Sequence, residues 1–105
     1  MNPKEDRRHH ERIVVPEDKL LACEGVSRPL NGKVSVLGIG GMFIRTKDSY
    51  APGTELELRV RADGETLETP CVVRDAAPGG LGVEFTWVRG PLEQKLKKLM
   101  VRLKP

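Results

Sequence analysis

Apolar and polar residues alternate most clearly in the stretch TELELRVRA, residues 54–62. Leu56, Leu58 and Val60 are separated there by charged residues at a period of two, which predicts a strand with one buried and one solvated face. Asp63-Gly64 fits a hairpin turn into the next apolar stretch. In GLGVEFTWV, residues 80–88, Val83 and Phe85 are expected to face the same way.

Turn residues recur every eight to twelve positions along the chain, from Pro16 to the Pro78-Gly79-Gly80 run. Such spacing is typical of short strands that close into a sandwich or barrel. The expected strands number about six, at residues 19–24, 32–37, 41–46, 54–62, 66–75 and 80–88. The pattern therefore predicts a mainly β fold.

The period changes after Gly90-Pro91, where four leucines recur at intervals of four, three and four residues: Leu92, Leu96, Leu99 and Leu103. Lysines and arginines occupy the other positions, so the segment is predicted to be an amphipathic helix. Its apolar stripe is expected to pack across one opening of the barrel.

Composition limits the protein class further. A chain of 105 residues with 38% hydrophobic residues predicts one small folded domain. The net charge is +3, but residues 89–105 carry six Lys or Arg and one Glu. The first twelve residues lack the apolar core of a signal peptide and no apolar run reaches membrane-spanning length, so a cytoplasmic protein is expected. Cys23 and Cys71 are interpreted as reduced core thiols, with a disulfide as the less favoured alternative.

The sequence DRRHHER, residues 6–12, gathers cations before the first apolar stretch. Arg8 and Arg12 are four apart, a spacing that places both side chains on one side of a helical or extended segment. Arginine can pair bidentately with phosphate oxygens or with guanine O6 and N7. From charge alone, a solvated tail neutralised by its own carboxylates is the simpler interpretation. The two adjacent histidines have no third ligand nearby, so no metal site is predicted.

The order of four segments resembles the PilZ domain, a bacterial family whose members typically bind cyclic di-GMP. The family pattern has an N-terminal RxxxR, a [D/N]xSxxG motif, a "pG" turn before an alternating strand and a "GlGvrF"-like strand. The corresponding segments of this chain are RHHER at 8–12, GKVSVLGIGGMFI at 32–44, APGTELEL at 51–58 and GGLGVEF at 79–85. The resemblance implies a six-stranded antiparallel β-barrel with a C-terminal α-helix. It divides the chain into a flexible basic segment at 1–12, a barrel at 13–89 and a helix at 90–105.

The resemblance also implies a ligand site, with cyclic di-GMP held by Arg7, Arg8 and Arg12 and by the second motif. In that motif Val36 stands where the family has an acid or amide and Gly38 where it has Ser, while Gly41 is kept. Losing one charged and one neutral hydrogen bond costs about 2 to 4.5 kcal/mol. Nucleotide binding is therefore expected to be weak or lost. The glycines of this segment are interpreted as a tight turn.

The leading hypothesis is a PilZ signalling module that binds cyclic di-GMP and passes the change to an unidentified protein partner. The alternative is a degenerate PilZ domain that binds no nucleotide and acts as an adaptor in motility or secretion. A small-barrel nucleic-acid binder is disfavoured, because aromatic residues are few and Phe43 and Phe85 are expected in the core. An enzyme is disfavoured, because no nucleophile-base pair or carboxylate pair stands out, and no cofactor is predicted.

Overall fold

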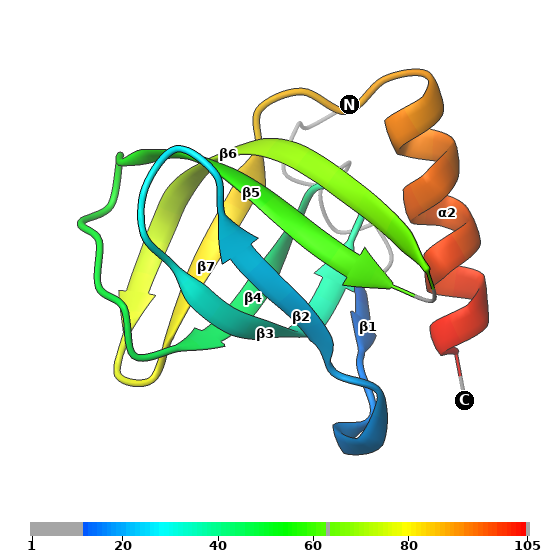
Figure 1. The fold of residues 1–105 in the computed structure, drawn as a ribbon, viewed down its shortest axis with the longest axis horizontal. Coiled ribbons are helices and arrows are strands. Elements are labelled where there is room, and N and C mark those ends of the chain that lie inside the picture. Colours follow the sequence, from blue (N-terminus) through cyan, green and yellow to red (C-terminus); the bar gives the residue numbers. More distant parts are fainter. Residues whose placement is uncertain (1–11, 63, 105) are drawn as a thin grey trace, which may run out of the picture.

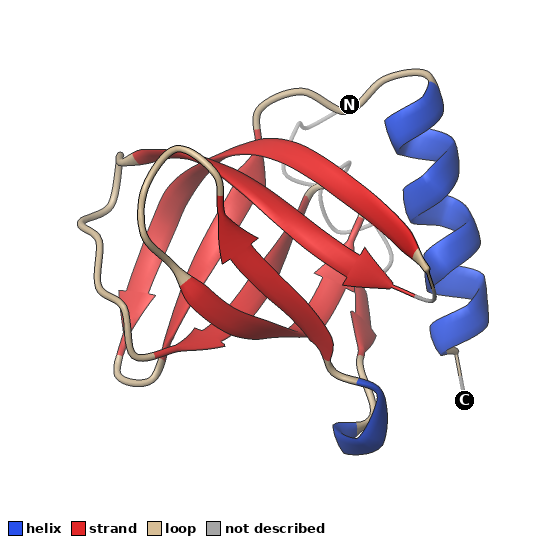
Figure 2. Cartoon of the chain, viewed as in Figure 1, coloured by secondary structure: helices blue, strands red, loops and turns tan. Residues whose placement is uncertain are grey.

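The structure, a computed structural model, describes residues 12–62 and 64–104. A curved antiparallel sheet forms the body of the molecule and a helix stands beside it (Figures 1 and 2). The elements are β1 (Arg12–Val14), η1 (Glu17–Lys19), β2 (Leu21–Gly25), β3 (Asn31–Gly38), β4 (Gly41–Thr46), β5 (Glu55–Ala62), β6 (Glu65–Ala77), β7 (Gly80–Phe85) and α2 (Pro91–Leu103), with η1 a 3-10 helix.

Six strands close into a barrel in the order β3-β2-β5-β6-β7-β4, and β4 returns to pair with β3. Every pairing is antiparallel. The predicted six-stranded antiparallel barrel with a C-terminal helix is thus confirmed, and the six predicted strands correspond to β2 through β7. The β5–β6 turn follows the expected hairpin, because Ala62 pairs with Glu65 and Gly64 has a φ of +80°.

The remaining strand, β1, was not predicted. It pairs with Val36–Gly38 at the end of β3, whereas β2 pairs with Asn31–Val34 at the beginning. Because β4 occupies the other side of β3, β1 and β2 lie one after the other along the same side. The short helix η1 connects them and projects below the barrel in Figure 1.

The barrel interior is filled by the side chains that the alternation predicted to be buried. Leu56, Leu58 and Val60 are at most 3% exposed. Val83 and Phe85 of β7 are also buried. Since successive side chains of a strand point to opposite faces, the charged residues of β5 lie on the outer surface.

The helix α2 closes part of this core. Its buried side chains are Leu96, Leu99, Met100 and Leu103. They pack against β3 and β6, and Figure 1 shows the helix beside the end of the barrel where β5 leads into β6. The helix begins at Pro91, whose fixed φ and missing N–H suit a first helical turn. No helix in residues 12–62 and 64–104 is both long and apolar enough to cross a membrane.

The two cysteines are buried free thiols, as the sequence predicted. Burial raises the pKa of Cys23 to about 12 and that of Cys71 to about 11. Desolvation disfavours the thiolate, so both side chains stay neutral at physiological pH and behave as small apolar groups.

Candidate functional site

Strand β1 brings the second arginine of the RxxxR segment to the second motif. Arg12 lies directly opposite Gly38, and Val14 lies opposite Val36, in the antiparallel register of β1 and β3. Opposite residues of an antiparallel pair share one face of the sheet. Arg12 and Val14 are exposed while Ile13 is buried, so the shared face is the outer one.

One end of the barrel holds three of the four candidate residues that the structure describes, namely Arg12, Gly38 and Gly41. We call this end the Arg12 rim and define it by Arg12, the β3–β4 turn from Gly38 to Gly41, and Phe85 at the end of β7. Arg12 forms no ion pair within the described part of the chain. The two other candidate arginines, Arg7 and Arg8, lie outside the described residues.

A bulge in β3 decides which way the second motif faces. The register between β3 and β4 shifts between Val34 and Val36, which leaves Ser35 as the extra residue. Both Val34 and Ser35 are buried, and the Ser35 carbonyl accepts a hydrogen bond from the Val15 N–H at 2.8 Å. An extra residue reverses the alternation beyond it. Val36 is therefore directed outward and Leu37 into the core.

Val36 belongs to an apolar row that crosses three strands. Val14, Val36 and Phe43 lie opposite one another on β1, β3 and β4. Val14 is 75% exposed and the other two are partly exposed. None of these side chains can donate or accept a hydrogen bond. The apolar row therefore offers shape and hydrophobic contact but no recognition of a base edge.

Phe43 was expected in the core, and that expectation is wrong. Its ring lies on the outer surface against Gly80 of β7, where an added Cβ would approach Phe43 Cζ to 2.3 Å. A glycine at this position leaves room for the ring to lie flat on the neighbouring strand.

Gly41 has a structural reason to be glycine. A Cβ at Gly41 would come within 2.2 Å of the backbone carbonyl oxygen of Val83, across the β4–β7 ladder. That distance is far below van der Waals contact, so any side chain would push the two strands apart. The glycine that this chain shares with the second motif is required by packing, whether or not a ligand also touches it.

Trp87, two residues after the end of β7, is an aromatic residue that the sequence did not single out as a candidate. The Phe85 N–H donates to the Gly40 carbonyl at 2.9 Å, which fixes the end of β7 at the Arg12 rim. Trp87 follows two residues later and is 57% exposed, with the Arg89 guanidinium 5.1 Å from its ring centroid. The sequence signal was the single tryptophan of the chain, near the end of the segment predicted as the last strand, with an arginine two positions on.

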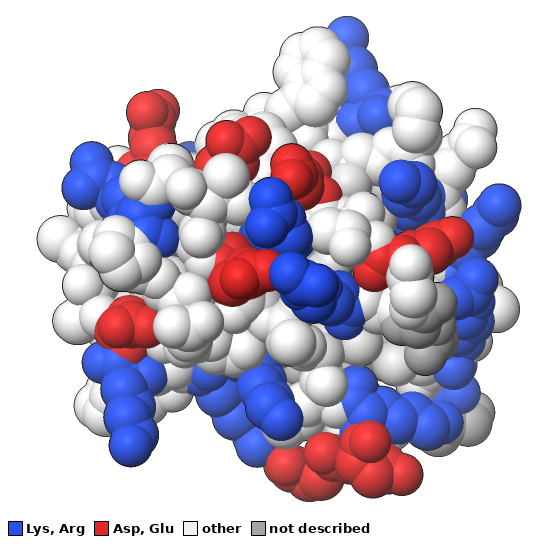
Figure 3. Space-filling view, viewed as in Figure 1, with Lys and Arg blue, Asp and Glu red and all other residues white. Residues whose placement is uncertain are grey.

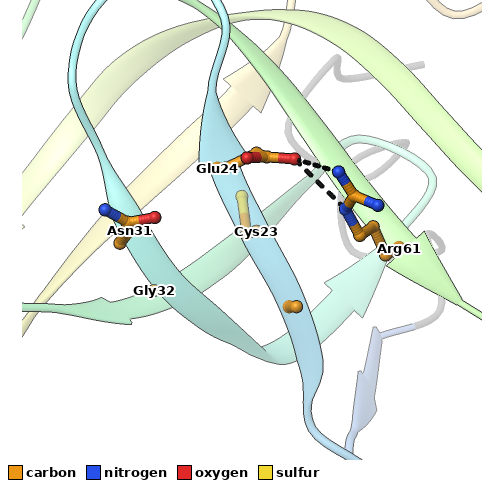
Figure 4. A pocket seen from close by; sticks show the side chains of 6 residues that line it. Cys23, Glu24, Asn31, Gly32 and Arg61 are labelled. Atoms are coloured by element: carbon orange, nitrogen blue, oxygen red, sulfur yellow. Dashed lines mark hydrogen bonds and ion pairs between the residues drawn. The ribbon is translucent and has the colours of Figure 1, made fainter.

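The outer wall formed by β2, β5 and β6 has a different character. Acidic and basic side chains alternate there, whereas mostly basic ones line α2 (Figure 3). Glu24 accepts hydrogen bonds from Arg61 beside a shallow hollow of about 160 Å³ (Figure 4), and this contact lowers the pKa of the Glu24 carboxyl. Arg59 pairs with Glu68 on the same wall. These charges are already neutralised, and no candidate site residue lines the hollow.

Comparison with known proteins agrees with this architecture. The family model described as PilZ domain matches residues 6–102. The chain is similar in structure to the PilZ domain with c-di-GMP of YcgR from Escherichia coli, with 16% identity, a TM-score of 0.79, and 92% of this chain and 91% of that chain covered.

Two further solved structures are similar. One is the PilZ domain of CeSA from a cellulose-synthesizing bacterium, with 21% identity, a TM-score of 0.68 and coverage of 89% and 97%. The other is the Bacillus subtilis inhibitor of motility MotI/DgrA, with 20% identity and a TM-score of 0.72. That match covers 97% of this chain and 55% of the other chain. Likeness at these identities shows the fold alone. No curated protein matches the chain.

Proposed function

The chain belongs to the PilZ domain family, and from that premise we propose that it is a bacterial signalling module that binds cyclic di-GMP at the Arg12 rim. Arg7, Arg8 and Arg12 supply the cations for the two phosphates. The ligand and the basic segment together form a new surface that a protein partner recognises. A receptor for an intracellular second messenger acts in the cytoplasm, and no enzymatic step is required of it.

The position of Arg12 opposite Gly38 carries this proposal. Arg12, the last residue of RxxxR, and Gly38 of the second motif are distant in sequence, and the pairing of β1 with β3 places them opposite each other. Arg12 has no carboxylate partner in residues 12–62 and 64–104, so its guanidinium is available for bidentate pairing with a phosphate.

The second motif weakens the proposed binding. Val36 and Gly38 replace side chains that the family pattern offers to the ligand, and the apolar row supplies no substitute hydrogen bond. The cost of about 2 to 4.5 kcal/mol corresponds to an affinity about 30-fold to 2000-fold below that of an intact motif. Arginine-phosphate pairing is left as the main attraction.

Calorimetric titration with cyclic di-GMP tests the proposal, with cyclic di-AMP and GTP as comparison ligands. Arg12→Ala should weaken binding by about 1.5 to 3 kcal/mol, because it removes a charge-assisted hydrogen bond. Arg28→Ala is the matched control, because Arg28 is an exposed arginine in the loop between β2 and β3. That loop precedes the first residue of β3, whereas Gly38 is the last. Both variants should melt close to the wild type. Equal affinity in wild type and Arg12→Ala would contradict the proposed site.

The apolar row favours a second function, that of an adaptor without nucleotide. An apolar side chain that is 75% exposed, as Val14 is, suits contact with another protein better than contact with a dianion. Absence of heat with all three nucleotides, from a protein shown to be folded, would favour this function over the first.

A further inference from the structure

Trp87 is exposed although tryptophan usually buries most of its large surface. More than half of its area is accessible, and the side chain belongs to neither the buried core nor the partly buried residues packed on it. Other side chains anchor the linker that carries it, because Val88 in the linker and Leu92 in the first turn of α2 pack against the core. The position of the linker therefore does not depend on the indole ring.

Two hydrogen bonds set where this ring emerges. The Phe85 N–H bonds to the Gly40 carbonyl, and the next N–H, that of Thr86, bonds to the Pro70 carbonyl at 2.9 Å. The chain leaves the barrel at this point, and two residues span at most about 7 Å. The Cα of Trp87 therefore lies within about 7 Å of the Cα of Phe85, the residue that ends β7 at the Arg12 rim.

Arg89 lies against the indole ring, with its guanidinium carbon 5.1 Å from the ring centroid. A guanidinium at this distance makes a cation–π contact, and 57% of Trp87 stays exposed to solvent. The pair therefore combines a π surface with a positive charge, which are the two features that bind a nucleotide without reading its base edge.

We propose that Trp87, supported by Arg89, is a stacking platform for a purine base of the nucleotide bound at the Arg12 rim. The inference rests on the proposed function and adds the means by which the base is held. Val36 and Gly38 provide no side-chain hydrogen bond to a base, whereas stacking requires only the base's π face. Because every purine has such a face, the platform favours guanine over adenine only weakly.

The experiment uses two independent measurements on the full chain, with cyclic di-GMP as the ligand. Calorimetry reports binding, and the emission of Trp87 reports stacking, since this is the single tryptophan of the chain. We expect wild-type emission to change with the same midpoint as the heat. Trp87→Ala should weaken binding about 5-fold to 140-fold, the range measured for loss of base–aromatic stacking. Trp87→Phe should recover most of the affinity.

Val101→Ala is the matched control, because it shortens an apolar side chain that is 67% exposed on α2. It should leave the affinity unchanged. Heat in the wild type, with constant emission and unchanged affinity in Trp87→Ala, would overturn the platform and leave the proposed function standing. No heat in the wild type would overturn both. A large fall in the melting temperature of Trp87→Ala would also overturn it, because the ring would then serve packing.

Discussion

Restoring the two polar side chains of the second motif should strengthen nucleotide binding. The variant combines Val36→Asp with Gly38→Ser. Val36 is partly exposed on the outer surface beside the Arg12 rim, whereas Gly38 lies within the rim opposite Arg12 and is buried; Gly38 lies in a strand and is not among the described glycines with positive φ. A serine therefore meets no backbone strain of the kind that a left-handed conformation imposes. The bulge before Val36 keeps the new carboxylate on the outer surface.

The structure sets the expected gain. A carboxylate and a hydroxyl that bond the ligand contribute about 2 to 4.5 kcal/mol together. The carboxylate also lies diagonally across from Arg12 in the β1–β3 register, and a cross-strand charge pair in the free protein is worth about 0.2 to 1 kcal/mol. Arg12 must break this charge pair to bind a phosphate, so the same free energy is subtracted from the gain in binding. The net gain is then about 1 to 4 kcal/mol, or about 5-fold to 700-fold in affinity.

Calorimetry with cyclic di-GMP measures this gain, and circular dichroism confirms that the variants fold. Val14→Asp is the control, because it places a carboxylate on the same apolar row but outside the motif. It should give no gain in affinity. The reasoning is refuted if the folded double variant binds no better than the wild type, or if the Val14→Asp control gains as much.

Three further predictions concern the fold. Gly41→Ala should lower the unfolding free energy by about 2 to 4 kcal/mol, because its Cβ would meet the Val83 carbonyl. Gly82→Ala on the adjacent strand should be tolerated, because its Cβ meets side-chain atoms no closer than 3.4 Å. Equal melting temperatures for the two variants would contradict the packing argument. In urea unfolding, Leu96→Ala should lower the unfolding free energy by about 2 to 5 kcal/mol because Leu96 is buried, and Val101→Ala should lower it by under about 0.5 kcal/mol because Val101 is exposed. Equal urea midpoints for the two variants would mean that α2 is not part of the folded unit. Burial raises the pKa of Cys23 to about 12, so the thiol ionises at lower pH in the unfolded chain than in the folded protein. The unfolding free energy should therefore fall as pH rises from about 9 toward 12, and a value that stays constant over that range would count against a buried thiol.

Much of the fold was readable from the sequence because the signals are local. A period of two along residues 54–62 predicts β5, and the change to helical spacing after Gly90 predicts α2. Turn residues separate the six strands of the barrel. The four segments of the family pattern are also local, and they predicted both the barrel and the chemistry of the arginines.

The site needed the tertiary structure, because its geometry depends on pairings between distant residues. Strand β1 has only three residues, too few for an alternation to be recognised, and it exists because β3 supplies its hydrogen-bond partners. The bulge at Ser35 turns Val36 outward, and a register shift leaves no mark in a single strand's sequence. The end of β7, two residues before Trp87, is held at the Arg12 rim by the hydrogen bond from the Phe85 N–H to the Gly40 carbonyl. Local propensity fixes which segments are strands, but the register between strands fixes which side chains meet.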